Sequence, residues 1–328
     1  MKKVLLIRLD KIGDLICTMC VDQVSFLKDC DVRWVISKGL GFVPDNADPK
    51  RKYIELSKEN WKDSLHVLRK FLREYKPDVA VSFQAPWWVS YALWAENVPT
   101  RAGVKSQWHS FLFLNRGLRQ RRSLATQHEA DYNLDLLLHA FDIEEDLLQE
   151  KTPILKLTAP ENIALLDKYK LAIKKYVVVH PGMAGSALNW PIPKYIELIE
   201  EVSKTTQVVL TGTPADESWL KDIKEHFKSN RHVLSLQNQL KPAELFTILK
   251  DAKAVVVPST GVAHMAASLG ATVLGIYSPV RVQHPRRWAA RGKDVHIFMP
   301  EIPDMDNVDP QCMEQIKVED LLKVLALQ

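Results

Sequence analysis

Short apolar runs alternate along the chain with longer segments in which apolar residues recur at helical spacing. The runs are rich in valine and isoleucine and too short for buried helices, which is typical of parallel strands covered on both faces. The clearest runs are residues 4–7, 32–36, 79–83, 176–179 and 208–210. Because strands that alternate with helices pair in parallel, the sequence predicts an α/β fold with doubly wound parallel sheets.

The segments between the runs predict helices, because their apolar residues are three or four positions apart and form one face. In residues 63–75 that face consists of Leu65, Leu68, Phe71 and Leu72. Further helices are expected at residues 131–141, 194–204, 242–250 and 318–325. The carboxyl ends of parallel strands meet at one edge of a sheet, so ligand-binding residues are expected in the loops that follow the strands.

The stretch of residues 252–279, AKAVVVPSTGVAHMAASLGATVLGIYSP, combines both patterns at short range. A β-branched run leads through Ser259, Thr260 and Gly261 into a small-residue helix, and a second apolar run follows. The first N–H groups of a helix have no partner within it and lie at its positive end, which favours an anion there. We therefore predict an anion site at these three residues, with His264 one turn into the helix beside it.

A glycine-bearing loop, HPGMAGS, follows the run at residues 176–179. It is not a Walker loop, because no Gly-Lys-Ser/Thr follows it, and by itself it is a weak phosphate signal at Gly182 and Ser186. After the next run, a Gly-Thr-Pro turn leads to Asp216. This acid could accept sugar hydroxyls or could simply lie at a helix start, where acids are common.

The first run continues into RLDKIGD, residues 8–14, which turns the chain into a helix. Gly13 allows the close approach of a ligand or an unusual dihedral angle. Asp14 suits two roles that remain open at this point: a first-turn acid that caps the helix, or a general base that deprotonates a hydroxyl group. His128, just before the helix at 131–141, is interpreted as a capping and packing residue.

The composition fits two globular domains, since 328 residues with 46% hydrophobic and 26% charged side chains can bury two cores. Residues 144–160 are acidic and then contain Pro153 and Pro160, which is typical of a domain boundary. We expect an N-terminal domain at 1–158 and a C-terminal domain at 159–328. The closing helix is expected near the interdomain region, where it could pack back on the N-terminal domain.

Charge is concentrated in one segment. A net charge of +4 is too small to indicate nucleic-acid binding, and no nucleic-acid-binding motif is present. Between residues 101 and 122, however, six basic residues occur without an acid, interleaved with aromatic and aliphatic side chains. This segment could be an ordinary solvated face, or it could dock an anionic amphiphile, and contact with nucleic acid is a third possibility that no accompanying motif favours. The candidate contacts are Arg116, Arg119, Arg121 and Arg122.

The four cysteines indicate a reducing compartment rather than chemistry. Cys17 and Cys20 form a CxxC pair, but no second pair of ligands accompanies it, so we expect both thiols to pack inside the first helix and predict no metal site. The apolar run after Met1 is interrupted by Arg8 and Asp10, which does not fit a cleavable signal. A cytoplasmic location is expected.

Six segments, in this order, resemble the lipopolysaccharide heptosyltransferases, glycosyltransferase family nine, of the GT-B fold. They are LLIRLDKIGDLICTMC, VPTRAGV, QHEADYNLDLL, HPGMAGSALNWP, STGVAHMAASLG and CMEQI. The resemblance implies two Rossmann-like domains facing a cleft, with an acceptor bound by the first domain and a nucleotide sugar by the second.

The resemblance also implies roles for single residues. Asp14 would be the catalytic base, next to Gly13 on the acceptor side. The donor's diphosphate would be bound at Thr260 and Gly261. The further donor contacts would be Gly182, Ser186, Asp216, Ser259 and His264. Together these imply an inverting, metal-independent transfer from ADP-heptose to an anionic lipid-linked saccharide, by a monomer at the inner face of the inner membrane.

Four positions depart from the family pattern: Cys20 stands where a proline is common, Ser278 stands where the turn usually has a glycine, and two further departures lie in the donor pocket. Ser259 stands where the family usually has an acid, and Leu188 where it usually has a cation. Such groups orient sugar hydroxyls and diphosphate, so the sequence leaves two alternatives open: a transferase with a different nucleotide-sugar donor, and a non-catalytic homologue that binds nucleotide sugars.

Overall fold

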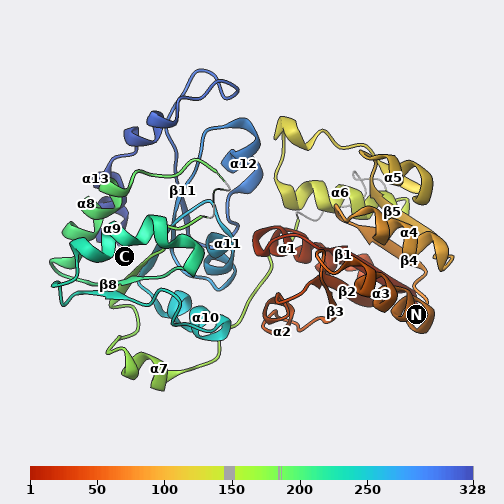
Figure 1. Ribbon diagram of the computed structural model, residues 1–328, viewed down its shortest axis with the longest axis horizontal. Coiled ribbons are helices and arrows are strands. Elements are labelled where there is room, and N and C mark those ends of the chain that lie inside the picture. Colours follow the sequence, from red (N-terminus) through yellow and green to blue (C-terminus); the bar gives the residue numbers. More distant parts are fainter. Residues whose placement is uncertain (144–151, 184, 186, 328) are drawn as a thin grey trace. The chain divides into compact units, whose positions relative to one another are not determined.

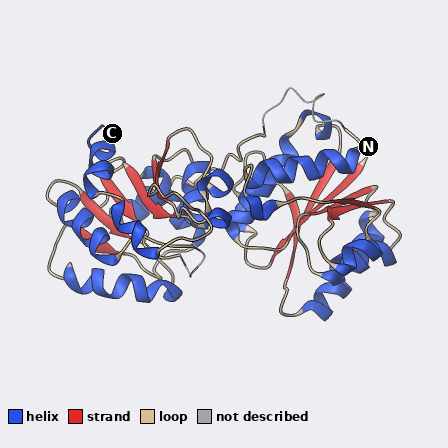
Figure 2. Cartoon of the chain, turned by 90° about the horizontal axis from the view of Figure 1, so that it is seen from above, coloured by secondary structure: helices blue, strands red, loops and turns tan. Residues whose placement is uncertain are grey.

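The computed structural model describes residues 1–327 except 144–151, 184 and 186 (Figure 1). The chain divides into two compact units: Met1–Arg122 with Gln127–Leu155, and Ser123–Thr126 with Lys156–Gln328. The sequence placed the boundary slightly later, between residues 158 and 159. Each unit is built around one parallel sheet, and Figure 2 shows helices on both faces of each sheet.

The sheet of the first unit has the strand order β3-β2-β1-β4-β5-β6, with every neighbouring pair parallel. Its strands are β1 (Lys3–Arg8), β2 (Asp31–Ser37), β3 (Lys52–Leu56), β4 (Val79–Ser82), β5 (Thr100–Val104) and β6 (Arg116–Leu118). Its helices are α1 (Ile12–Met19), α2 (Phe42–Asp45), α3 (Trp61–Tyr75), α4 (Trp87–Ala95), α5 (Trp108–Phe113) and α6 (Glu129–Phe141), with short 3₁₀ turns η1 (Cys20–Gln23), η2 (Ser25–Leu27) and η3 (Arg122–Leu124).

The first core forms on both faces of this sheet because successive side chains of a strand point to opposite faces. Leu5 and Ile7 of β1 pack with Leu68 of α3 and Leu93 of α4 on one face. On the other face α6 packs against β4, β5 and β6, and α1 packs against β1 and α6.

The cysteines of α1 and η1 belong to the packed interior, as expected. Cys17 and Cys20 are buried, and burial raises the pKa of the Cys17 thiol well above its ordinary value. The thiol is therefore a packing group rather than a nucleophile.

The sheet of the second unit has the order β12-β11-β10-β7-β8-β9, again with parallel neighbours. Its strands are β7 (Tyr176–Val179), β8 (Gln207–Leu210), β9 (Val233–Ser235), β10 (Ala254–Pro258), β11 (Val273–Ile276) and β12 (Val295–Phe298). Its helices are α7 (Ile163–Lys168), α8 (Ile192–Ser203), α9 (Glu217–His226), α10 (Pro242–Asp251), α11 (Gly261–Ser268), α12 (Pro285–Trp288) and α13 (Val318–Leu327), with 3₁₀ turns η5 (Pro214–Asp216), η6 (Arg281–Gln283) and η7 (Pro310–Gln315).

Counted in chain order within each unit, both sheets have the doubly wound order 3-2-1-4-5-6. The predicted fold class is therefore confirmed. In such sheets the strand order reverses at one point, and ligands bind in the crevice outside the carboxyl ends of the two strands that flank it. These strands are β1 and β4 in the first unit, and β7 and β10 in the second.

The closing helix α13 packs against α8 within the second unit. Its Val318, Leu321 and Leu325 share a core cluster with Leu198 of α8. Among the described residues, no helix has both the length and the apolar character needed to cross a membrane.

Candidate functional site

Two adjoining cavities open at the carboxyl edge of the first sheet. One, of about 460 Å³, is lined by loop residues that follow β1, β2 and β3, among them Asp10, Asp14 and Lys58. The other, of about 430 Å³, lies between the loops that follow β4 and β5. Lys58 and Gln84 line both cavities. Both cavities thus lie beside the topological switch point of the first unit, where ligand binding is expected.

A buried arginine organises the carboxylates of the larger cavity. Arg8, at the end of β1, is fully buried, and its guanidinium lies 2.5 Å from Asp14 Oδ1, 2.9 Å from Asp10 Oδ2 and 3.6 Å from Glu129 Oε1. Burial opposes the charge of Arg8, but the charges of Asp14, Asp10 and Glu129 outweigh it and raise the arginine's pKa. Arg8 therefore stays cationic and holds three carboxylates around itself.

Asp14 is one of the two carboxylates of this network that reach the cavity. Its side chain is 23% exposed and that of Asp10 is 24% exposed, whereas Glu129 is completely buried. Asp14 lies in the first turn of α1 directly after Gly13, as the sequence suggested. It is a first-turn acid and not the N-cap residue, because Lys11 occupies that position. A solvent-accessible carboxylate that a buried cation holds in place is suited to accept a proton from a bound hydroxyl group.

Lys58 was not foreseen from the sequence, whereas Gln84 follows the run at residues 79–83 and lies in one of the loops where ligand-binding residues were expected. The Lys58 ammonium group donates to Asp10 Oδ1 at 2.6 Å. Gln84, just beyond β4, has a φ of 60°, a left-handed backbone conformation that is costly outside glycine and often marks functional sites. Lys58 follows β3, and only the prediction of that strand could have placed it at this edge.

The smaller cavity is lined by hydroxyl, amide and imidazole groups together with apolar side chains such as Val104 and Leu114. His109 of α5 is buried, with Nδ1 3.3 Å from Ser90 Oγ and Nε2 2.9 Å from Gln107 Oε1. Burial lowers the pKa of His109, which favours a neutral ring that exchanges hydrogen bonds with its neighbours. Such a lining is suited to saccharide hydroxyl groups.

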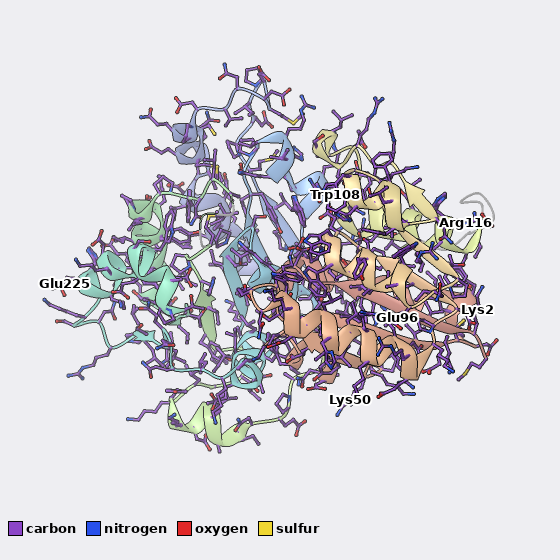
Figure 3. The ribbon with its side chains drawn as sticks, turned by 45° about the vertical axis from the view of Figure 1, so that its right-hand side comes forward. Lys2, Lys50, Glu96, Trp108, Arg116 and Glu225 are labelled. Carbon is purple, nitrogen blue, oxygen red and sulfur yellow. The ribbon has the colours of Figure 1, made fainter. Side chains whose placement is uncertain are left out.

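The four arginines proposed as acceptor contacts do not form one surface. The prediction was wrong for Arg122, because its side chain is only 5% exposed and pairs with the buried Glu129. Arg122 is therefore part of the interior. Arg116 pairs with Asp142. Arg119 and Arg121 are exposed. Figure 3 places Arg116 well apart from Trp108, which belongs to the same basic segment.

In the second unit, the loops after β7 and β8 meet at Gly182 and Asp216. A Cβ atom on Gly182 would lie 2.2 Å from Asp216 Cγ, so only glycine allows this approach. Asp216 is buried, and its Oδ2 accepts hydrogen bonds at 2.8 Å from both the backbone N–H and the hydroxyl of Thr213. One oxygen of Asp216 is thus used by the turn that it stabilises. Its proximity to Gly182 joins the two candidate donor segments.

His180 lies directly at the end of β7 and was not chosen from the sequence. Its N–H donates to the Val256 carbonyl of β10 at 2.9 Å, and its Nδ1 lies 3.0 Å from Thr211 Oγ1. Burial lowers the pKa of His180 to about 4, against the opposing charge of Asp216. A neutral imidazole at the start of the glycine loop therefore connects the ends of β7 and β8 through Thr211.

The predicted anion site lies on the neighbouring strand β10 and begins α11. Thr260 is the N-cap residue, and its hydroxyl accepts from the Val262 N–H at 3.3 Å. Ser259 and Gly261 are half-buried, whereas His264 is 5% exposed and therefore less accessible than the residues at the helix start. Because β7 and β10 are neighbours, the structure brings Gly182 and the start of α11 to one switch point. Ser186 lies outside the described residues.

Among the residues that the structure describes, no group of three or more His, Cys, Asp or Glu side chains is arranged to hold a metal ion. Late in its sequence the chain contains an Asp-x-Asp triplet, Asp304-Met305-Asp306, and both acids already have hydrogen-bond partners. Both oxygens of Asp306 accept from Arg281 at 2.6 Å, and Asp304 Oδ1 accepts from the Asp306 N–H at 2.9 Å.

Two doubly wound units, each with a candidate ligand site at its switch point, match the architecture of the GT-B glycosyltransferases. The chain belongs to glycosyltransferase family 9 (heptosyltransferase), which matches residues 65–317. It is therefore a glycosyltransferase, as the resemblance of its motifs predicted.

Solved structures and a curated relative agree with this assignment. A family 9 glycosyl transferase from Veillonella parvula matches 99% of this chain over 97% of its own, with a TM-score of 0.82 and 17% identity. The ADP-heptose lipopolysaccharide heptosyltransferase II of E. coli matches 100% of this chain over 99% of its own, with a TM-score of 0.74 and 17% identity. A Haemophilus influenzae protein with a provisional glycosyltransferase name is 24% identical over 347 residues, covering 100% of this chain and 96% of that protein.

Proposed function

We propose that this glycosyltransferase moves a heptose from ADP-heptose to an anionic, lipid-linked saccharide of the lipopolysaccharide core type, with inversion and without a metal ion. The observation that carries the proposal is the Asp14 carboxylate, held by buried Arg8 at the edge of a cavity in a family 9 chain. ADP-heptose is the donor that the name of the E. coli relative gives for that protein.

The first unit would bind the acceptor. The reacting hydroxyl group would lie in the cavity that Asp14 lines, next to Gly13, and the neighbouring sugar would occupy the polar cavity beside His109. Asp14 would remove the hydroxyl proton as the oxygen attacks the anomeric carbon. Arg8 would keep the carboxylate oriented, and Lys58 would provide a cation for acidic groups of the acceptor.

The second unit would bind the donor. The diphosphate would lie at the start of α11, where Thr260 and Gly261 face it with the unpaired N–H groups of a helix end. The glycine loop at Gly182 would approach the donor from β7, and Asp216 would position that loop while leaving one oxygen for the nucleoside. Negative charge that develops on the leaving diphosphate would be stabilised by these fixed dipoles, which can replace a metal ion in this role.

A different nucleotide sugar is the alternative that the second unit favours. Leu188, where the family usually has a cation, is half-buried against the core of this unit and contributes no charge to a donor. Ser259 contributes a hydroxyl group in place of a carboxylate. Both differences affect the donor side and leave the Asp14 side unchanged.

A product assay tests the proposal. The protein is incubated with deacylated lipopolysaccharide core acceptors and with ADP-heptose or other ADP- and UDP-sugars, and released nucleotide and glycosylated product are measured. We expect the fastest transfer from ADP-heptose, an inverted anomeric configuration by NMR, and an unchanged rate with EDTA. Faster transfer from another sugar would replace the donor. Nucleotide binding without transfer from any donor would identify a non-catalytic homologue and refute the enzymatic proposal.

A further inference from the structure

Helices α4 and α5 expose a set of large apolar side chains on the outside of the first unit. The two helices lie side by side, as Figure 1 shows, and pack against one another. The exposed fractions are 39% for Trp87, 48% for Trp94, 62% for Trp108, 50% for Phe111 and 65% for Leu112. These five residues are called the aromatic surface below. Large apolar groups gathered in this way usually mark a site of interaction.

Ring contacts make the aromatic surface continuous. Tyr91 lies 6.1 Å from Trp94 and 5.7 Å from Phe113, measured between ring centroids. Phe113 in turn lies 5.6 Å from Trp94 and 6.3 Å from Trp108. Trp94 and Trp108 are therefore connected through the rings of Tyr91 and Phe113 rather than exposed separately.

The helix α5 has two different faces. His109 and Ser110 are buried, and His109 lines the polar cavity of about 430 Å³. Trp108, Phe111 and Leu112 face outward. The same short helix thus presents polar groups to a proposed acceptor cavity and apolar groups to the surroundings, directly beside that cavity.

Cations accompany the aromatic surface. Lys105 Nζ lies 4.9 Å from the centroid of the Phe111 ring, and the Arg119 guanidinium lies 5.7 Å from it. Residues 101–122 contain no acid. Glu96, just after α4, is neutralised by Arg69 and Arg73. The charge next to the exposed rings is therefore positive.

We infer that the aromatic surface docks the first unit on an anionic lipid bilayer, with Lys105 and Arg119 at the level of the lipid phosphates. Tryptophan and phenylalanine side chains favour the membrane interface, and nearby basic residues are attracted by anionic lipids. This inference rests on the proposed function for its purpose. A bilayer against α5 brings the saccharide of a lipid-linked acceptor next to the cavity that His109 lines.

Vesicle co-sedimentation tests the surface, with phosphatidylcholine alone or mixed with phosphatidylglycerol. The unmodified chain is expected to bind the mixed vesicles more strongly than the vesicles of phosphatidylcholine alone. The double variant Trp108→Ser/Leu112→Ser should lower the partition coefficient about tenfold by removing two interfacial side chains. Its matched control is Ile163→Ser/Ile173→Ser, which removes side chains that are 67% and 56% exposed on the second unit. The control should bind like the unmodified chain.

Charge is tested separately with Lys105→Gln/Arg119→Gln. Each cation near an anionic surface strengthens binding roughly fivefold, so the pair should lower partition to mixed vesicles by about 25-fold and flatten its salt dependence. Lys28→Gln/Lys50→Gln, two exposed lysines of the same unit, is the control and should change little. Circular dichroism and thermal melting verify that all variants fold.

Several results would overturn the inference. They are the absence of vesicle binding by the unmodified chain, equal binding by Trp108→Ser/Leu112→Ser, and a dimer in gel filtration without lipid that this variant converts to a monomer. The last result would assign the aromatic surface to a second copy. Turnover on a deacylated, soluble acceptor separates this test from the proposed function. Trp108→Ser/Leu112→Ser should keep that turnover, whereas vesicle binding without transfer to any acceptor would refute the proposed function and support the docking surface.

Discussion

Replacing Asp14 by asparagine removes the proposed base while keeping the shape of the side chain. The buried network around Arg8 contains two guanidinium groups, Arg8 and Arg122, and three carboxylates, Asp10, Asp14 and Glu129. Lys58 also pairs with Asp10, so three cations face three carboxylates and Asp14→Asn leaves one cation in excess, but Arg8 keeps Asp10 and Glu129 as counter-charges. The variant is therefore expected to fold, and its kinetics report the chemistry of position 14.

The size of the effect follows from the proposed role. A positioned general base contributes about 10²- to 10⁴-fold to a rate, which corresponds to about 3–5 kcal/mol of activation free energy. The proposed donor residues Gly182 and Thr260 belong to the second unit, whereas Asp14 belongs to the first. We therefore expect kcat to fall by about 10² or more, with the Kd for ADP changed by less than about twofold.

Asp10→Asn is the matched control. Asp10 contacts the same guanidinium, lines the same cavity and is 24% exposed, against 23% for Asp14. It differs in its additional contact with Lys58. Steady-state kinetics with a soluble acceptor, together with calorimetry for ADP, compare the two variants. An equal loss of kcat in both would assign the effect to the Arg8 network, and an unchanged kcat in Asp14→Asn would refute the base.

Three further variants examine the interior of the two units. Arg122→Met removes the closer of the two guanidinium groups beside the buried Glu129, while Arg8 remains, and should lower the free energy of unfolding in urea by about 1–3 kcal/mol. Exposed Arg121→Met should change it by less than about 0.5 kcal/mol, and similar losses in the two variants would contradict the burial argument. Burial lowers the pKa of His180 to about 4 from an ordinary 6.5, so the unfolded chain binds the proton first as pH falls. The neutral His180 ring contributes its full share to the free energy of unfolding above pH 6.5, and this share is lost as the pH falls from 6.5 to about 4. His180→Asn should therefore make the free energy of unfolding depend less on pH in this range. An unchanged pH dependence would exclude His180 as its cause. Gly182→Ala forces a Cβ against Asp216 and should weaken ADP binding at least tenfold by calorimetry while lowering stability by about 1–3 kcal/mol; unchanged affinity would remove the glycine loop from the donor site.

The central strands could be predicted from the sequence because burial on both faces leaves an uninterrupted apolar run. β1, β4 and β7 are almost entirely buried and were found with nearly correct bounds. The edges of the sheets gave no such signal. β3 reads KYIEL and is mostly half-exposed, and β6 is the three-residue segment RGL. An edge strand has one neighbour and needs fewer apolar residues, so its pattern resembles that of a loop.

The helix α4 was missed for the opposite reason. Its sequence WWVSYALWA is apolar on every side, so it has no amphipathic period that a sequence pattern could reveal. Trp88 and Leu93 face the core, while Trp87 and Trp94 are exposed. Only the structure separates the two faces and thereby makes the outer one recognisable as an interaction surface.

In the candidate site, too, residues with a local sequence signal could be predicted, whereas residues placed by distant parts of the chain could not. Thr260 was predicted at a helix start because the signal is local, and it is the N-cap of α11. His128 was likewise predicted to cap, and its Nδ1 accepts from the Ala130 N–H at 3.1 Å. Lys58 could not be predicted, because its place depends on the edge strand β3, and the approach of Gly182 to Asp216 depends on two loops separated in the sequence.

The basic segment illustrates why composition alone could not assign roles to its residues. Arg122 is drawn inward because Glu129, seven positions later, is fully buried, and Glu129 also lies 3.6 Å from Arg8. Charges of alternating sign therefore connect Arg122 through Glu129 and Arg8 to Asp14. Among the residues that the structure describes, no acid pairs with Arg119, and its guanidinium lies over the exposed Phe111 ring instead. Cations that look equivalent in sequence thus separate into one that supports the proposed base from the interior and one that is available to a partner outside.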